Sequence, residues 1–295
     1  IALVEAESPS QIRDEFEFSG LSVVCTNPQT DSYADYRCDF ELWEVDSGFM
    51  MYIGCNVTYS KFFDDGTLRT FLTYGIDRQT LVDDNYGGLA LPTTLPISPM
   101  SPYYSKSLAT NYDYDEMRFI DAASKFRVPT NDKGVPRTLQ LLVNSDDSAR
   151  LRCARNIAAT LTELGLACET VESPTSVYEA RLQAANYDIY LGITKLPTTA
   201  DLSEFYRPWG EMSWGGLANE TIYNMVNQSL ADRGNYYNLH KLVADDGRII
   251  PVMAGYYAIY AKRGVLSDLN PARDNVFYYT LGKTMESSKV ATQFS

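Results

Sequence analysis

Apolar residues recur with two different periods in residues 138–193, and the pattern predicts strands and helices in alternation. Short apolar runs have the length and composition of buried strands, and they stand at 138–143, 166–171 and 187–193. Between the first two runs, apolar residues recur at helical spacing: Leu151, Ala154, Ile157, Ala158, Leu161 and Leu164. A second helix is expected at about 175–185.

Local signals at the ends of these segments support the same assignment. Ser145, Asp146 and Asp147 offer caps for the first helix, and Gly165 ends it. The order strand-helix-strand-helix-strand predicts an α/β fold with right-handed crossovers and parallel strands. Ligands of open α/β sheets bind beyond the carboxyl ends of the strands, so the segment after Ile193 is the first candidate for function.

Upstream of this region the pattern predicts a hairpin and two short helices. Residues 40–45 and 49–57 are strand-like, and turn-forming residues at 46–48 separate them, which predicts a β-hairpin. Helical spacing follows at Leu68, Phe71 and Leu72 and again at Leu81 and Val82. Asp77 is expected to cap the second of these helices, which should end by Gly87.

Three further segments complete the pattern. Four prolines in residues 92–102 predict an extended loop on the surface, because proline lacks the backbone donor that helices and central strands need. Residues 220–243 are predicted as one helix. Residues 248–253 and 256–261 are predicted as strand or buried extended chain. The first 35 residues are polar and resemble an element cut from a larger domain.

Composition excludes several classes of protein. With 45% apolar residues in 295, the chain can fill a core, so it is not disordered. A net charge of −13 without a basic block argues against nucleic acid as a partner. No stretch has the roughly 18–20 consecutive apolar residues that span a bilayer. Tyrosine is abundant, with 22 residues, which suits a wet binding cleft.

Few residues are suited to catalysis or metal binding. His240 is the only histidine, and the five cysteines contain no C-x-x-C pair, so neither a catalytic nor a metal site is predicted, and no cofactor is expected. Cys25 and Cys38 form the best disulfide candidate. Cys153 is expected early on a helix and Cys168 on the strand after it, too far apart to bridge easily. Four Asp-Asp pairs stand at 64–65, 83–84, 146–147 and 245–246, where capping and turn roles are expected.

Several passages together resemble the extracellular solute-binding proteins of ABC importers, in the peptide/nickel group called family 5. Residues 52–56 (YIGCN), 63–65 (FDD) and Arg69 are similar to one family sequence, and residues 72–82 (LTYGIDRQTLV) are similar to its "ALxYAIDRxxLV". Residues 186–189 (NYDI), 214–216 (WGG) and 248–252 (RIIPV) then follow in the order of the family.

The resemblance implies the C-terminal lobe of a two-lobed, type II periplasmic-binding-protein-like fold, with a mixed sheet flanked by helices. Residues 1–37 would then be the cut end of the N-terminal lobe and hinge. Residues 38–270 would form the ligand-binding lobe, and residues 271–295 would return toward the other lobe, much of which lies outside this chain. In such proteins the two lobes close on a ligand about a hinge.

The resemblance also indicates candidate ligand-binding residues. Setting Phe205 against the family's phenylalanine places Thr198 where peptide-binding members carry an aspartate that holds the amino terminus of the peptide. Asp201 is a possible substitute, while Lys195 and Arg207 suit an anionic or carbonyl-rich ligand. Aromatic side chains complete the set, and each either lines the cleft or packs against the lobe: Trp209, Trp214 and Tyr103.

The function implied is capture of a peptide or similar small polar solute and its delivery to an ABC permease in the membrane. No covalent chemistry is needed, so the protein is expected not to be an enzyme. Its expected location is extracellular or periplasmic, tethered to the cell membrane as a lipoprotein. The alternative is a sensor or assembly protein that uses a binding-protein-like lobe without transport, because the amine-binding aspartate is replaced.

Overall fold

The computed structural model describes residues 8–18, 20–26, 36–86, 90–266, 269 and 271–273. These residues form two compact units. One contains the described residues of 1–47 and 255–295, and the other, larger unit spans 48–254. The three-part division at residues 37 and 270 stays a prediction, and residues 274–295 of its last part lie outside the described residues.

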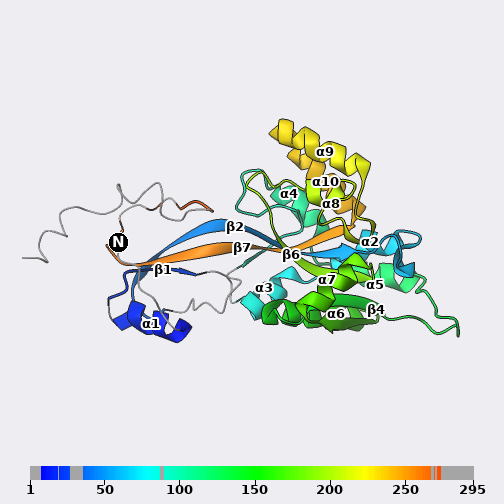
Figure 1. Ribbon diagram of the computed structural model, residues 1–295, viewed down its shortest axis with the longest axis horizontal. Coiled ribbons are helices and arrows are strands. Elements are labelled where there is room, and N and C mark those ends of the chain that lie inside the picture. Colours follow the sequence, from blue (N-terminus) through cyan, green and yellow to red (C-terminus); the bar gives the residue numbers. More distant parts are fainter. Residues whose placement is uncertain are drawn as a thin grey trace, which may run out of the picture. The chain divides into compact units, whose positions relative to one another are not determined.

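The described strands form one mixed sheet (Figure 1). Their bounds are β1 Val23–Thr26, β2 Phe40–Cys55, β3 Ala90–Pro92, β4 Leu139–Asn144, β5 Cys168–Ser173, β6 Ile189–Lys195 and β7 Ile249–Lys262. The hydrogen-bonded order is β1-β7-β2-β6-β4-β5, and β3 pairs with β7. β4 is parallel to both β5 and β6, whereas β2 is antiparallel to β6. The parallel β-α-β-α-β unit predicted for residues 138–193 is therefore confirmed.

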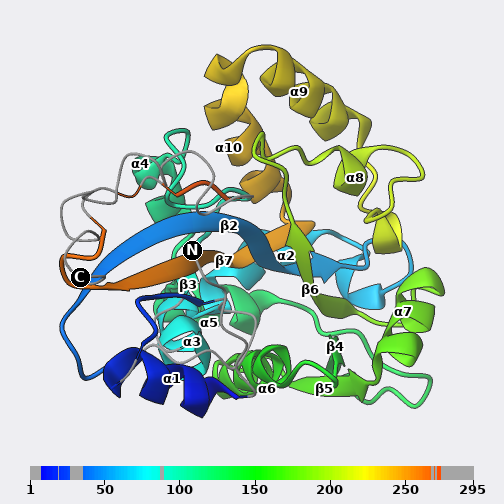
Figure 2. The ribbon, with the colours of Figure 1, turned by 60° about the vertical axis from the view of Figure 1, so that its left-hand side comes forward.

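The helices of the larger unit lie on both faces of its strands. Their bounds are α2 Thr67–Phe71, α3 Arg78–Tyr86, α4 Lys106–Ala109, α5 Glu116–Lys125, α6 Ser148–Glu163, α7 Thr175–Gln183, α8 Ser203–Tyr206, α9 Glu220–Ala231 and α10 Tyr236–Asp246. Short 3-10 turns add η1 Lys61–Phe63, η2 Leu72–Gly75, η3 Thr110–Tyr112, η4 Trp214–Gly216 and η5 Arg233–Asn235. In both views α3 and α6 lie on one side of the strands, and α9 and α10 on the other (Figures 1 and 2).

Capping explains where the central helices begin and end. The carboxylate of Asp147 accepts a hydrogen bond from the backbone N–H of Arg150 at 2.9 Å, so it caps α6 as predicted. Gly165 follows α6 with φ 98°, a left-handed conformation that favours glycine. Asp77 likewise accepts from the N–H of Thr80 at the start of α3.

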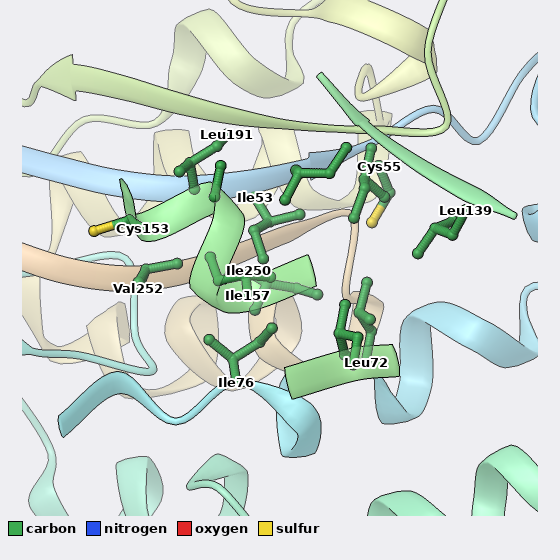
Figure 3. Close-up of a cluster of buried hydrophobic side chains, with 14 of the residues drawn as sticks. Ile53, Cys55, Leu72, Ile76, Leu139, Cys153, Ile157, Leu191, Ile250 and Val252 are labelled. Carbon is green, nitrogen blue, oxygen red and sulfur yellow. The ribbon is translucent and has the colours of Figure 1, made fainter. Parts of the chain in front are cut away.

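Alternate residues of each central strand enter one of two apolar clusters, because neighbouring side chains of a strand point to opposite faces. Ile53, Leu191 and Val252 belong to the first cluster, which α6 covers with Ile157 (Figure 3). On the opposite face, Tyr52 and Tyr190 belong to the second cluster, which includes side chains of α7 to α10. The larger unit therefore has a core on each side of its sheet.

The hairpin predicted for residues 40–57 is wrong, because residues 40–55 form one continuous strand, β2. Residues 49–55 pair with β6 rather than with residues 40–45. Gly48 has a positive φ of 81°, a value that a turn could use. Its carbonyl nevertheless accepts a hydrogen bond from the N–H of Leu196 at 2.8 Å. Pairing with β6, a strand far along the chain, therefore decides that residues 49–55 continue the strand and do not fold back on residues 40–45.

The single helix predicted for residues 220–243 is also corrected, since α9 ends at Ala231 and α10 starts at Tyr236. Asp232 breaks the helix because its extended backbone lets its carboxylate accept from the N–H of Gly234 at 2.9 Å. The two short helices predicted around residues 68–86 are confirmed as α2 and α3.

The proline-rich stretch is a loop, as predicted, but residues 93–98 are buried rather than on the surface. Leu95 and Ile97 pack in a small apolar cluster with Tyr112 of η3. The hydroxyl of Thr93 donates to the carbonyls of Leu95 and Ile97, at 2.9 and 3.2 Å. Side-chain hydroxyls thus satisfy backbone acceptors that no strand neighbour satisfies, and this permits burial.

In the smaller unit, α1 (Pro9–Phe18) precedes β1, which pairs antiparallel with residues 258–261 of β7. Apolar side chains of β7 and the residues after it, Ile259, Ala261, Leu266 and Leu269, form a further cluster. Cys25 and Cys38 are free thiols, so the candidate disulfide between them is not formed. No helix among the described residues is long and apolar enough to span a membrane.

Candidate functional site

The order of the strands places a candidate site at the carboxyl ends of β4 and β6. From β4 the chain passes through α6 to β5 on one side, and then through α7 to β6 on the other side of β4. Such a reversal of strand order separates the loops that follow the two strands, and the crevice between them is where open α/β sheets bind ligands. The loops concerned are residues 145–147 and 196–202.

The loop after β4 is fixed by hydrogen bonds to the start of α7. Asp146 Oδ2 accepts from both the N–H and the hydroxyl of Thr175, at 2.9 and 2.7 Å. These hydrogen bonds from Thr175 lower the pKa of Asp146. Asn144 donates from its side-chain amide to the hydroxyl of Thr175 at 3.0 Å. Sequence reasoning assigned Asp146 to capping and missed Thr175, whose partner lies 29 residues away.

The loop after β6 contains two predicted site residues, Thr198 and Asp201. The side chain of Thr198 is exposed. Asp201 is engaged within the loop, because one carboxylate oxygen accepts from the N–H and the hydroxyl of Ser203, at 2.8 and 2.6 Å. The hydroxyl of Tyr236 donates to the carbonyl of Thr199 and so ties the loop to α10.

Tyr103 lies against the same part of α10. Its ring stacks on that of Tyr236, with centroids 5.1 Å apart and an interplanar angle of 27°. Its hydroxyl accepts a hydrogen bond from Arg233 at 3.0 Å, and 37% of the residue is exposed. Tyr236, which sequence reasoning did not single out, therefore connects Tyr103 with the loop after β6.

Arg207 is already paired. Its guanidinium donates to both carboxylate oxygens of Glu204, at 3.0 and 2.8 Å. The bond to Glu204 raises the pKa of Arg207, and the bond from Arg207 lowers that of Glu204. Glu204 also accepts from the N–H of Glu211 at 2.9 Å. The pair holds the turn that follows α8, and the spacing of three residues was a signal for it in the sequence.

The two tryptophans differ sharply in their surroundings. Trp209 is 95% exposed and adopts φ 63°, a left-handed conformation that is strained for a bulky residue. Gly210 closes the turn around it by donating to the carbonyl of Arg207 at 3.2 Å. Trp214 is partly buried against the second apolar cluster. Lys195, at the end of β6, lies with its ammonium 5.8 Å from the ring centroid of Phe49.

The structure therefore gathers some predicted residues and leaves others apart. Tyr103 and the Thr198–Asp201 loop meet around Tyr236, and Arg207 and Trp209 share the turn after α8. Lys195 lies beside Phe49, and Trp214 packs against the second apolar cluster. Two hollows, of about 590 and 280 Å³, lie elsewhere, beside η1 and residues 126–137 and beside Arg78. Neither is lined by Trp209 or the Thr198–Asp201 loop.

Two of the four Asp-Asp pairs have the turn and capping roles that were expected, whereas the pairs at 83–84 and 245–246 lie within α3 and α10. Asp65 accepts from the N–H of Thr67 at 2.9 Å, and Asp147 caps α6. Asp246 is instead the last residue of α10 and lies 3.2 Å from both Arg69 and Arg248. The described residues contain no group of three or more His, Cys, Asp and Glu side chains that could hold a metal ion.

His240 is completely buried on α10, and neither ring nitrogen has a hydrogen-bond partner among the described residues. Burial lowers its pKa from 6.5 to about 4, so the ring is neutral at physiological pH. Its burial in the core is that of a structural residue.

The stability of the protein should therefore depend on His240 as the pH falls. His240 binds a proton below about pH 6.5 in the unfolded chain but only below about pH 4 in the folded chain. Its contribution to the free energy of unfolding is therefore complete above pH 6.5 and is lost as the pH falls from there to about 4. Between pH 7.5 and pH 5, the wild type should lose about 2 kcal/mol more than His240→Leu in urea unfolding. Equal losses in the two proteins would contradict a depressed pKa.

Known proteins share the sequence pattern and the fold of this chain. The sequence profile of the bacterial extracellular solute-binding proteins, family 5 Middle, matches residues 11–216. The putative peptide binding protein AppA from Clostridium difficile superposes with a TM-score of 0.68 at 14% identity, over 87% of this chain and 55% of that one. The ABC transporter substrate binding protein CtaP from Listeria monocytogenes gives 0.71 at 13% identity, over 92% and 57%.

NikA from Brucella suis, in complex with Fe(III)-EDTA, superposes with a TM-score of 0.70 at 14% identity, over 95% of this chain and 60% of that one. The chain thus spans little more than half the length of these structures. At such identities the likeness shows the fold, which confirms the predicted mixed α/β class and matches about half of a type II periplasmic binding protein. No protein with curated annotation matches the sequence.

Proposed function

The chain belongs to the bacterial extracellular solute-binding proteins of family 5, a non-enzymatic family, and from this premise we propose that it captures a peptide or similar small polar solute between two lobes and delivers it to an ABC permease. Residues 38–270 serve as the lobe that binds the solute, and residues 1–37 and 271–295 connect it to the other lobe. A lipid anchor on the whole protein keeps it at the outer face of the membrane.

The observation that carries the proposal is the reversal of strand order at β4. It brings together, at one edge of the sheet, the loops that follow β4 and β6. Hydrogen bonds of Asp146 and Asp201 hold these two loops in shape without a ligand. Loops that are already fixed lose little conformational entropy when a solute binds, and such preorganisation favours affinity. Closure of a second lobe over this edge would remove the solute from water.

The seven candidate residues have three roles in this proposal. The exposed side chain of Thr198 and the ammonium of Lys195 contact polar groups of the solute. Apolar parts of the solute are covered by Tyr103, Trp209 and Trp214. Asp201 and Arg207 act on the shape of their loops, through Ser203 and Glu204. Since a hydroxyl at Thr198 replaces an aspartate, the solute does not require a free amino group.

Ligand-dependent melting of the purified protein tests the proposal. Peptide, oligopeptide and metal-chelate libraries should contain a solute that raises the melting temperature, since a ligand at 100 times its Kd adds about 2.7 kcal/mol to stability. Absence of a shift with every library would overturn it.

The variant Trp209→Gly separates binding from folding in the same experiment. Glycine accepts the left-handed φ of 63°, so the unliganded variant should melt at or above the wild-type temperature while its ligand-induced shift shrinks. Trp214→Ala serves as the contrast, because loss of a partly buried ring should lower the unliganded melting temperature itself.

A further inference from the structure

Arg150 stands in the first turn of α6, directly after the loop that follows β4. Only 8% of the residue is exposed. A buried charge is unfavourable unless it is paired and hydrogen-bonded, so the partners of its guanidinium indicate whether the folded chain itself satisfies it.

The folded chain satisfies Arg150 only in part. Nε lies 3.4 Å from Asp147 Oδ2 and makes no hydrogen bond, and the guanidinium carbon lies 5.5 Å from the ring centroid of Tyr178. The two terminal nitrogens have no hydrogen-bond acceptor among the described residues. Unlike Nε, they are not among the fully buried atoms that lack a partner, so they reach the surface.

For two other arginines of the chain, the folded protein supplies hydrogen-bond acceptors to the guanidinium. Arg78, which is 4% exposed, donates four hydrogen bonds, three of them to backbone carbonyls. Arg155 donates two to the carboxylate of Glu172, at 2.7 and 2.8 Å. Arg150 is nearly as buried as Arg78 but has neither arrangement.

The position of Arg150 is the edge proposed above for the solute. Tyr178 belongs to α7, and its hydroxyl donates to the carbonyl of Leu191 in β6 at 3.0 Å. The guanidinium over this ring therefore lies where β4 ends beside β6. Asp146, which precedes Asp147 in the chain, is occupied by Thr175, and the N-terminus of α6 adds positive potential.

We propose that the terminal nitrogens of Arg150 bind a carboxylate of the solute, so that this site takes carboxylate-bearing solutes. The planar fork of a guanidinium matches the two oxygens of a carboxylate, and an anion there would supply the hydrogen bonds that the chain leaves unmade. The inference rests on the proposed function, because it assigns the class of ligand to the same edge. It transfers the anion-binding role expected of Arg207 to a residue that the sequence did not indicate.

Sodium acetate is the probe that tests this without knowledge of the natural solute. In ¹⁵N-labelled protein, the Arg150 side-chain signal, assigned with Arg150→Lys, should shift with acetate in a saturable way and not with sodium chloride at the same ionic strength. Arg207, already paired with Glu204, should not respond. Equal responses of Arg150 to acetate and chloride would overturn the inference.

A solute found in the melting experiment gives the second test. Arg150→Gln should weaken its binding at least tenfold, which is the scale of hydrogen bonds to a charged group. Arg152→Gln, an exposed arginine on the same helix, removes the same charge and should change it less than twofold. Arg150→Lys keeps the charge without the fork and should fall between them. A solute that binds all variants equally would overturn the role of Arg150 while leaving the proposed function intact.

Discussion

Replacing Arg78 with methionine should lower the free energy of unfolding by about 3–5 kcal/mol, the scale for removing one partner from a buried charged network. Its Nε donates to the carbonyl of Pro251 in β7 at 2.8 Å, and Nη1 donates to those of Thr73 and Ile76, both at 3.2 Å. Methionine fills similar space but removes the hydrogen bonds that the guanidinium donates to these buried carbonyls. The guanidinium thus links η2, α3 and β7.

The charge of Arg78 persists despite its burial. Desolvation lowers its pKa to about 10, which still leaves it protonated at neutral pH, with nearby Asp113 opposing the shift. Urea unfolding of Arg78→Met, Arg78→Lys and Gln79→Met measures the effect. The lysine variant should lose about half as much because its ammonium cannot reach all the carbonyls. Gln79 is the exposed neighbour, and its replacement should change stability by less than about 0.5 kcal/mol.

Replacing Gly54 with alanine should cost about 3 kcal/mol through overpacking. In the register of β2 and β6, Gly54 lies opposite Tyr190, and Tyr52 lies opposite Gly192. Each tyrosine ring covers the glycine across from it, and the two rings meet edge to face with centroids 5.7 Å apart. A Cβ on Gly54 would come within 2.2 Å of Tyr190 Cε1, and that ring is fully buried and has nowhere to move.

A double-mutant cycle tests this explanation. Tyr190→Leu removes the atoms in conflict, so Gly54→Ala should be far less destabilising in that background, with a coupling energy of about 1–3 kcal/mol. Gly20→Ala is the control, because no atom lies within 4 Å of the added Cβ. Additive losses in the cycle would mean that the backbone of β2, and not the contact with Tyr190, needs glycine.

The sequence predicted best where the deciding interactions are local. The strands and helices of residues 138–193 follow from periodicity and from caps such as Asp147, which act within one turn. The hairpin at residues 40–57 fails for the opposite reason. Turn-forming residues at 46–48 permit a reversal, but pairing with β6, about 140 residues later, decides against it. The local sequence therefore permits more than one backbone structure, and pairing with a distant strand decides which one forms.

The candidate site divides in the same way. Thr198, Asp201 and Tyr103 were predicted from their places along the chain, and the engagement of Arg207 by Glu204 was foreseeable from their spacing. The link from Tyr103 through Tyr236 to the loop after β6 was not, because it joins segments far apart in sequence. In the sequence, nothing distinguishes Arg150 from other polar residues near the start of a helix. Its burial against Tyr178 is evident only in the structure.

By itself, the sequence determined the order of strands and helices in residues 138–193, the α/β class and, through its motifs, the family. The tertiary structure alone decided which charges are free to meet a solute: it pairs Arg207 with Glu204 and Asp201 with Ser203, and it leaves the fork of Arg150 incompletely satisfied. The physical reason is that periodicity and capping depend on neighbours within a few residues. The satisfaction of a buried charge depends on every element packed around it.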